Sequence, residues 1–214
     1  MDTNIKIVCI SDTHGLHDQV ELPKGDILIH AGDCTNYGTT AQVSQFIHWF
    51  SEQDFKHKIF IAGNHDFFFE EQSEVLIHDL LSDYPNVIYL EDSEVTVEGL
   101  KIWGSPYTPT FFDWAFMRDR GEEIQQHWDL IPKDTDILIT HGPPYRILDT
   151  APGHKSVGCE ELLIAIKKVN PMYHIFGHIH GDYGVEQQID TTFVNASICS
   201  EQYKPINKPI IIEI

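Results

Sequence analysis

Five short segments of this sequence carry acidic, amide and imidazole side chains at close spacing. In chain order they contain Asp12 and His14, Asp33, Asn64 and His65, His141, and His178 with His180. With His65 set aside, the mixture of oxygen and imidazole donors suits Mn, Fe, Ni, Co or Zn better than calcium or magnesium. These remaining donors are too many for one open catalytic ion. They fit two divalent ions if one carboxylate bridges the pair, which can then hold a phosphoryl oxygen and a hydroxide.

Six short runs of β-branched and other apolar residues predict strands, and all but the one at residues 86–90 precede one of these segments. The runs span residues 5–10, 26–31, 58–62, 86–90, 136–140 and 173–176. Apolar residues at i, i+3, i+4 and i+7 predict amphipathic helices between them, at residues 43–50 and 159–166. Such alternation indicates β-α-β units, in which ligands bind beyond the carboxyl ends of the strands. We therefore expect the five segments to meet in one crevice.

Further strands are predicted in the middle and at the end of the chain. A hairpin is expected at residues 95–103, and late strands at 185–189, 192–194 and 210–214. They indicate an α/β (α+β) fold with one mixed sheet or two sheets, and 214 residues suit a single domain over residues 1–214. Residues 105–118, rich in aromatic residues and proline, form the least regular stretch, which we expect to be a loop over a site.

The spacing within the segments suggests roles for individual residues. Strand alternation would direct Asp12 and His14 to the same ion, and the same rule would apply to His178 and His180. Glycines at 32, 63, 142, 177 and 181 permit the sharp turns and close backbone approach that a metal pair requires. His65 is placed to face a substrate, and Asp66 is the candidate partner that fixes its tautomer.

The ordered motifs D-x-H, G-D, G-N-H-D, H-G-P-P and G-H-x-H resemble those of the calcineurin-like metallophosphoesterases, from residue 5 to about residue 214. Six stretches further resemble the metallophosphoesterase-domain-containing proteins, relatives of the class III cyclic nucleotide phosphodiesterases. These stretches are residues 11–14, 30–33, 104–106, 141–144, 158–159 and 195–197. Serine/threonine protein phosphatases have Asp-Arg-Gly after the G-D motif, whereas residues 34–37 here read Cys-Thr-Asn-Tyr, which argues against protein phosphatase activity.

The resemblance implies a four-layer fold, a β-sandwich of mixed sheets flanked by helices. It also implies the division of the ligands between the ions. Asp12, His14 and His180 would hold one metal and Asn64, His141 and His178 the other. Asp33 would bridge the two ions, and His65 would be the acid that faces the substrate.

The function expected on these grounds is metal-dependent phosphodiester hydrolysis. A hydroxide between two divalent ions, Mn²⁺ first among the candidates, would attack phosphorus while His65 donates a proton to the leaving oxygen. The expected substrates are small nucleotide-like diesters, cyclic nucleotides among them. Two alternatives stay open: a phosphomonoesterase or pyrophosphatase of the same fold, and a non-catalytic scaffold that uses the fold to bind protein. The sequence does not decide the oligomeric state.

Composition narrows the partners and the compartment. Fourteen Lys+Arg against 33 Asp+Glu leave a formal charge of −19, and protonating all 13 His would still leave −6, so long nucleic acids are disfavoured. No apolar run approaches the roughly 18 residues needed to span a bilayer. An acid in the first residues, where a secretory signal carries bases, favours the cytoplasm. Four scattered cysteines indicate free buried thiols.

Several residues near the motifs are weaker candidates. His17 follows the first motif and could touch a phosphate, as could His154 in a glycine-containing loop after His141, although each also suits an ordinary structural role. Asp149 could orient His141 or simply stabilise a turn. The three consecutive phenylalanines at 67–69 indicate core or lid packing rather than a platform for a base.

Overall fold

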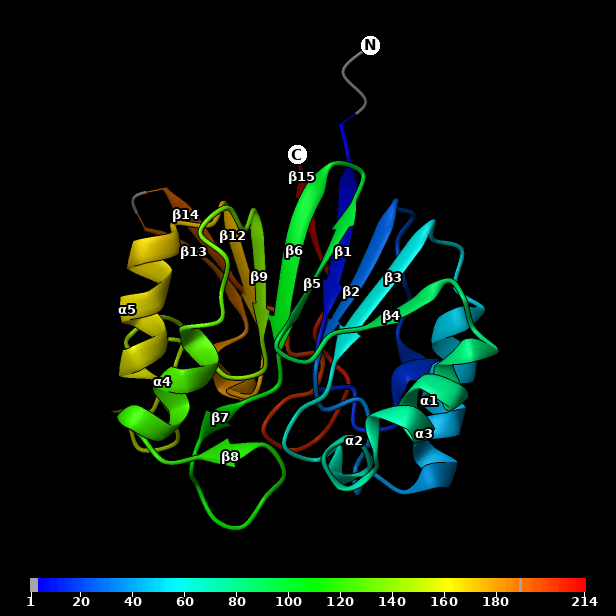
Figure 1. Cartoon of the computed structure of the whole chain (residues 1–214), viewed down its shortest axis with the longest axis horizontal. Coiled ribbons are helices and arrows are strands. Elements are labelled where there is room, and N and C mark those ends of the chain that lie inside the picture. The colour runs from blue at the N-terminus through cyan, green and yellow to red at the C-terminus, as the bar shows by residue number, and fades with distance from the viewer. Residues whose placement is uncertain (1–3, 189) are drawn as a thin grey trace.

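Two β-sheets pack face to face in the computed structural model, which describes residues 4–188 and 190–214 (Figure 1). The first sheet has the strand order β15 (Ile210–Glu213), β1 (Lys6–Ile10), β2 (Ile27–Ala31), β3 (His57–Ile61) and β4 (Val87–Tyr89). Strands β1 to β4 run parallel, and β15 pairs antiparallel with β1. Their carboxyl ends therefore share one edge of the sheet.

The second sheet is mixed. Its order is β13 (Gly184–Gln188), β14 (Thr191–Asn195), β12 (Tyr173–Phe176), β9 (Ile137–Thr140), β6 (Leu100–Ser105) and β5 (Ser93–Val97). Strands β6, β9, β12 and β14 are parallel, with β5 and β13 antiparallel at the two edges. The prediction of mixed sheets is thus confirmed, with two sheets rather than one.

Helices cover the outer faces of both sheets (Figure 1). Beside the first sheet lie α1 (Thr40–Ser51), α2 (Phe67–Glu71) and α3 (Glu74–Ser82), and beside the second lie α4 (Glu122–Trp128) and α5 (Glu160–Val169). Shorter elements complete the loops: η1 (His17–Gln19), η2 (His180–Asp182), the pair β7 (Thr108–Pro109) and β8 (Met117–Arg118), and the pair β10 (Thr150–Ala151) and β11 (Lys155–Ser156).

Strand alternation builds two layers of core. In β1, Ile7 and Cys9 belong to a buried cluster that takes residues from both sheets, whereas Val8 and Ile10 belong to the cluster that includes the helices. All four side chains are fully buried. Burying an aliphatic side chain of this size contributes roughly 1.5–3 kcal/mol, so these near-continuous apolar runs require both faces of each sheet to be covered. The result is the expected four-layer sandwich.

The predicted strand runs and both amphipathic helices are present, with boundaries shifted by a few residues; Ile189 lies outside the described residues. Helices α2, α3 and α4 were not predicted as elements; α2 and α4, with five and seven residues, are too short to show the i to i+7 pattern. Phe68 and Phe69 of α2 are buried, as expected for core packing. Within the described residues, no helix is long and apolar enough to cross a bilayer.

Candidate metal centre

The predicted ligands follow strands of both sheets. Asp12, Asp33 and Asn64 follow β1, β2 and β3 of the first sheet, and His141 and His178 follow β9 and β12 of the second. An isolated parallel bridge between Ser11 and Ser197 links the loops beyond β1 and β14. The carboxyl ends of parallel strands thus meet between the sheets, which is where open α/β folds place their ligands.

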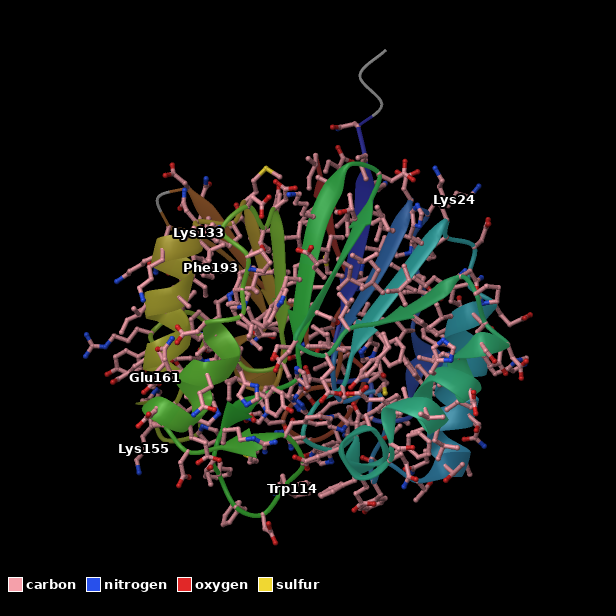
Figure 2. The ribbon with its side chains drawn as sticks, in the orientation of Figure 1. Lys24, Trp114, Lys133, Lys155, Glu161 and Phe193 are labelled. Atoms are coloured by element: carbon pink, nitrogen blue, oxygen red, sulfur yellow. The ribbon has the colours of Figure 1, made fainter. Side chains whose placement is uncertain are left out.

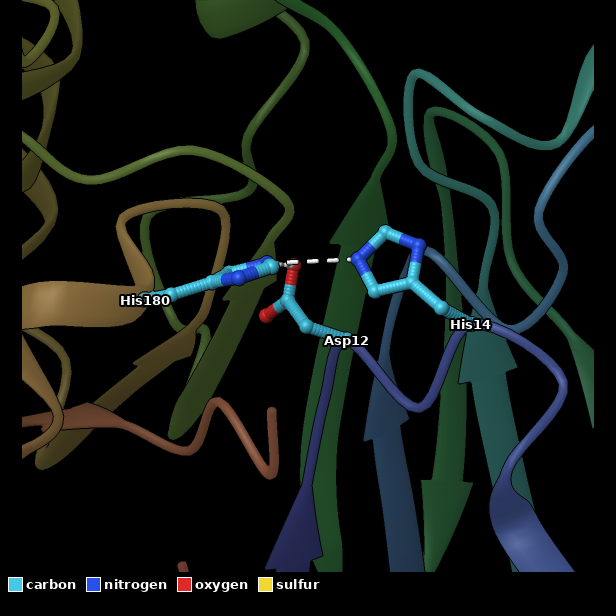
Figure 3. Close-up of side chains that lie close together, drawn as sticks. All are labelled: Asp12, His14 and His180. Atoms are coloured by element: carbon cyan, nitrogen blue, oxygen red, sulfur yellow. Dashed lines mark hydrogen bonds and ion pairs between the residues drawn. The ribbon is translucent and has the colours of Figure 1, made fainter. Parts of the chain in front are cut away.

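One group of ligands consists of Asp12, His14 and His180 (Figure 3). The Nε2 atom of His180 lies 3.3 Å from Oδ1 of Asp12 and 3.2 Å from Nε2 of His14. Asp12 is fully buried and His14 nearly so. Two imidazole nitrogens and a carboxylate oxygen therefore converge on one point.

A second group consists of Asp33, His141 and His178. Nε2 of His141 lies 3.3 Å from Oδ2 of Asp33 and 3.0 Å from Oδ1 of Asn64. The rings of His141 and His178 are in edge contact, with centroids 5.0 Å apart. This group offers the second mixed oxygen and imidazole site that the sequence suggested.

Asp33 stands between the two groups. Its Oδ2 lies 3.3 Å from Nε2 of His141, 3.7 Å from Nε2 of His14 and 4.0 Å from Nε2 of His65. Its Oδ1 accepts a hydrogen bond from the backbone N–H of His65, at 2.8 Å. One carboxylate oxygen thus faces ligands of both groups, which is the position that a bridging ligand requires.

Left-handed backbone conformations, not strand alternation, direct these side chains. The strands end before the ligands, and φ is 53° at Asp12, 44° at His14, 54° at Asp33 and 67° at His178. Non-glycine residues rarely adopt this conformation, and strain of this kind is typical of functional sites. The same-ion reasoning for His178 and His180 was wrong: the turn at His178 and helix η2 send the two rings to different groups. The family resemblance implies a similar grouping, with Asn64 added to the second group, and the assignment of these groups to two ions stays a prediction.

Glycines let the ligand loops approach one another, as expected. A Cβ atom on Gly32 or Gly63 would lie closer than 3.0 Å to His141, and one on Gly177 would clash with the carboxylate of Asp12. Such distances are not found between real Cβ atoms and their neighbours. Any larger side chain at these positions would push ligand atoms apart, so the glycines set the dimensions of the site.

Backbone carbonyls set the tautomers of two ligand histidines. Nδ1–H of His141 donates to the carbonyl of Ala31 at 2.9 Å, and Nδ1–H of His180 donates to the carbonyl of Ser200 at 3.0 Å. Each Nε2 lone pair is thereby turned toward the cluster, the usual arrangement of histidines that bind metals. Oδ2 of Asp12 accepts from Oγ of Ser197 at 2.8 Å, and the N–H of His178 is shared between Oδ2 at 2.9 Å and Oδ1 at 3.1 Å, while Oδ1 faces Nε2 of His180.

The buried carboxylates of Asp12 and Asp33 favour positive charge on the groups next to them. Burial alone would lower the pKa of His141, but the carboxylate of Asp33 outweighs it and raises the pKa to about 9. Burial would likewise lower the pKa of His180, yet its hydrogen bond to Asp12 raises it. Nε2 of His141 faces two oxygen acceptors, so it needs either a proton or a cation there. Divalent ions would meet this requirement, and the residues present fit a metal pair.

His65 lies beside the cluster, but its partner is not the predicted one. Nδ1–H of His65 donates to the carbonyl of Asn36 at 2.9 Å. Asp66 instead accepts from the backbone N–H groups of Cys34, Thr35 and Gly63, and from the Thr35 hydroxyl. The prediction that Asp66 fixes the His65 tautomer was therefore wrong. Asp66 directly precedes helix α2 without capping it, and its carboxylate instead joins the loop after β2 to the loop after β3.

Two cavities open beside the cluster. One, of about 300 Å³, runs from Asp33, Asn64, His178 and His180 to an apolar wall that includes Trp114. The other, of about 530 Å³, is lined by His14, Asn36, Tyr37 and neighbouring residues. Three side chains, His65, Trp114 and Tyr203, line both. Part of the irregular stretch 105–118 therefore lies at a cavity beside the ligands, as expected of a loop over a site.

Comparison with known proteins agrees with this geometry. The sequence profile described as calcineurin-like phosphoesterase matches residues 5–182. The chain belongs to this family. Membership implies metal-dependent hydrolysis of phosphate esters. The two groups of candidate ligands around Asp33 are where this family membership implies that the metal ions bind.

Curated relatives match nearly the whole chain. Metallophosphoesterase domain-containing protein 1 of Homo sapiens is 43% identical, covering 98% of this chain and 71% of the human one. A UPF0046 protein of Caenorhabditis elegans is 39% identical over 98% of this chain and 75% of its own length. Among solved structures, a protein of Thermus thermophilus has a TM-score of 0.62 at 16% identity, covering 90% of this chain and 89% of its own, a likeness of fold.

The weaker candidates lie apart from the ligands. His17 is buried against Trp49, with ring centroids 4.9 Å apart, and lines neither cavity. His154 is exposed at the turn between β10 and β11 and also lines neither. Asp149 does not orient His141: it accepts from the N–H groups of Arg146 and Gly158 and from the Ser156 hydroxyl.

Sequence reasoning assigned no part in the site to several residues. The carbonyls of Asn36 and Ser200 orient His65 and His180, and a backbone carbonyl leaves no signature in residue types. Ser197 lies in one of the stretches that carry the family resemblance, which was the available signal for its contact with Asp12. Trp114 could be suspected only from the aromatic content of its loop, and Tyr203 had no signal.

Proposed function

We propose that this family member is a phosphodiesterase for small, nucleotide-like diesters, with cyclic nucleotides as natural test substrates and Mn²⁺ as the first metal to supply. The observation that carries the proposal is the lining of the two cavities. None of the described residues that line them is Lys or Arg, and Glu201 adds a carboxylate. A monoester has nearly two negative charges at neutral pH, whereas a diester has one and needs no further cationic partner.

The same pair of cavities suits the shape of a diester. A diester has an organic substituent on each side of phosphorus, whereas a monoester has one. The cavities of about 300 Å³ and about 530 Å³ meet at His65, Trp114 and Tyr203, next to the ligand groups. A phosphate held by the cluster could therefore place one substituent in each cavity.

Within this proposal Asp12, His14 and His180 would hold one ion, and Asn64, His141 and His178 the other, with Asp33 shared. When bound, the two ions would neutralise phosphate charge and lower the pKa of a water nucleophile. The chain itself orients the donors: backbone carbonyls turn the rings of His141 and His180, and Ser197 with the N–H of His178 directs Asp12.

His65 is the proposed proton donor to the leaving oxygen. Its Nδ1–H is committed to the carbonyl of Asn36, so in the protonated ring Nε2–H is the donor left for a substrate. That Nε2 lies 4.0 Å from Oδ2 of Asp33, at the edge of the cluster and in contact with both cavities. Together with His14 and Asp33, His65 also forms a third set of side chains close enough to hold an ion, and in this proposal its ring faces the substrate instead.

The cytosol is the compartment that we propose for the protein. The four cysteines, Cys9, Cys34, Cys159 and Cys199, are all free and buried. Burial raises the pKa of the thiols of Cys9, Cys34, Cys159 and Cys199, which keeps them in the unreactive protonated form. Free thiols of this kind are typical of reducing compartments.

Steady-state kinetics with Mn²⁺-loaded protein test the proposal. We expect kcat/KM for bis-nitrophenyl phosphate or a cyclic nucleotide to exceed that for nitrophenyl phosphate, after correction for intrinsic reactivity. The Asp33→Ala variant is the control for contaminating phosphatases. A clear preference for the monoester would favour a phosphomonoesterase or pyrophosphatase. Absence of turnover with two ions bound would favour the non-catalytic scaffold.

A further inference from the structure

The loop between β7 and β8 places the indole of Trp114 in the wall of the two cavities beside the candidate metal ligands. Figure 2 shows Trp114 on this loop, at the end of the molecule away from the chain termini. Its ring centroid lies 4.3 Å from that of His65 and 6.0 Å from that of Phe67, and the planes are tilted by 36° and 37°. Trp114 is only half-buried, so part of the indole is open to the cavities that it lines.

The backbone holds this indole in a defined place. The N–H of Ala115 donates to the carbonyl of Asn64 at 3.2 Å, which joins the loop directly to a predicted metal ligand. Ala115 and Phe116, which follow Trp114, are fully buried and anchor the loop in the core. Phe111 and Phe112 at the tip of the loop are 63% and 74% exposed, so the fixed part of the loop is the part that carries the indole.

The position of His65 determines which part of a substrate meets Trp114. If His65 gives its proton to the leaving oxygen, the substituent on that oxygen must lie beside the His65 ring. Trp114 packs on that ring and forms the cavity wall next to it, together with Phe112 and Met117. A flat ring stacks well on an indole face, and such stacking is tolerant of the ring's identity.

We propose that Trp114 is a specificity-determining residue, the wall of a subsite for a planar aromatic substituent on the leaving side of the phosphodiester. The inference rests on the proposed function, because it takes the leaving side from His65. It goes beyond that function by naming the chemistry of the leaving group, a nucleobase or an aryl ring, and the side chain that selects it.

Binding of three non-hydrolysable phosphonates to the Mn²⁺-loaded protein, followed by calorimetry, tests the subsite without turnover. Phenylphosphonate, cyclohexylphosphonate and methylphosphonate present the same charged group and differ only in the substituent. In the wild type we expect phenylphosphonate to bind about three- to tenfold more tightly than the other two. The Trp114→Leu variant should lose this ratio while binding methylphosphonate normally. Trp49→Leu, which removes a half-buried indole that lines neither cavity, should keep it.

The outcomes separate the subsite from the proposed function. An unchanged phenyl-to-methyl ratio in Trp114→Leu, or equally tight binding of the cyclohexyl and phenyl compounds, would overturn the subsite even if diesters are hydrolysed. A general structural defect in Trp114→Leu would weaken all three compounds together, leave the ratio unchanged, and so count against the proposal. A ratio that depends on Trp114 in a protein that hydrolyses no phosphate ester would support the subsite and refute the phosphodiesterase.

Discussion

Replacing Asp66 by alanine should loosen the metal centre without touching any ligand. The buried carboxylate of Asp66 accepts from the N–H groups of Cys34 at 3.1 Å, Thr35 at 2.9 Å and Gly63 at 2.8 Å, and from the Thr35 hydroxyl at 2.7 Å. Cys34 follows Asp33, the proposed bridging ligand, and Gly63 precedes Asn64 and His65. Asp66 therefore links the two loops that carry Asp33 and Asn64, and Asp66→Ala removes the hydrogen bonds that hold these loops together.

The cost of the change follows from the donors left behind. Three buried backbone N–H groups would lose their partner, and each unpaired buried donor costs about 1–3 kcal/mol. Part of this is offset because burial of the charged carboxylate, followed by the nearby charge of Asp33, raises the pKa of Asp66, a sign that the charge itself is unfavourable there. We expect a net loss of about 3–5 kcal/mol in the free energy of unfolding. Metal affinity should fall about 10–100-fold, as for other residues that support ligands.

Urea unfolding of metal-free protein and calorimetric titration with Mn²⁺ measure the two effects separately. Asp149→Ala is a matched control, since Asp149 is a buried carboxylate that accepts from two backbone N–H groups and a hydroxyl in a loop without ligands. It should lower stability while leaving metal affinity intact. If Asp66→Ala bound Mn²⁺ as tightly as the wild type, the reasoning that this carboxylate positions Asp33 would be refuted.

Three further predictions follow from the geometry. Asp33→Ala should lose more metal, measured by elemental analysis, than His14→Ala or His178→Ala, because a bridging carboxylate would bind both ions; retention of two ions would contradict the bridge. His65→Ala should keep its metal content but lower kcat about 10²–10⁴-fold, less so for a nitrophenolate leaving group, and equal losses on good and poor leaving groups would exclude the acid role. Burial lowers the pKa of His174 to about 3, so only the unfolded chain gains its proton between the ordinary value of 6.5 and about pH 3. The contribution of His174 should therefore lower the stability as the pH falls through that window, by about 1.4 kcal/mol per unit. Urea unfolding at several pH values should give His174→Phe a slope that is shallower by about this amount, because other buried histidines with lowered pKa values, His14, His30 and His178, keep their own contributions.

Much of the fold was predictable because its determinants are local. Runs such as residues 5–10 and 173–176 are apolar on both faces, and only a strand covered on both sides accommodates them. The short helices α2 and α4 escaped prediction, since five and seven residues hold too little periodicity to separate helix from loop. Only the structure decided between one sheet and two. It has two large sheets, and residues from both form one buried cluster between them.

The chemistry of the site was also legible in the sequence. Asp12, Asp33, Asn64 and His141 stand directly after apolar strands, and parallel strands must bring their carboxyl ends to a common edge. The donor types then indicate transition metals, and the glycines at 32, 63 and 177 mark where backbones approach. Residue type and order in the chain are enough for these conclusions, because neither depends on the exact path of a loop.

The direction of each side chain was decided by the tertiary structure. His178 and His180 are two residues apart yet serve different groups, because a left-handed turn and a 3-10 helix replace the expected strand between them. The partner of His65 is a carbonyl 29 residues away, and the adjacent Asp66 faces the core instead. Trp114 and Tyr203 reach the same two cavities from distant loops. Spacing along a chain constrains neighbours in sequence, whereas such contacts depend on where folding closes each loop.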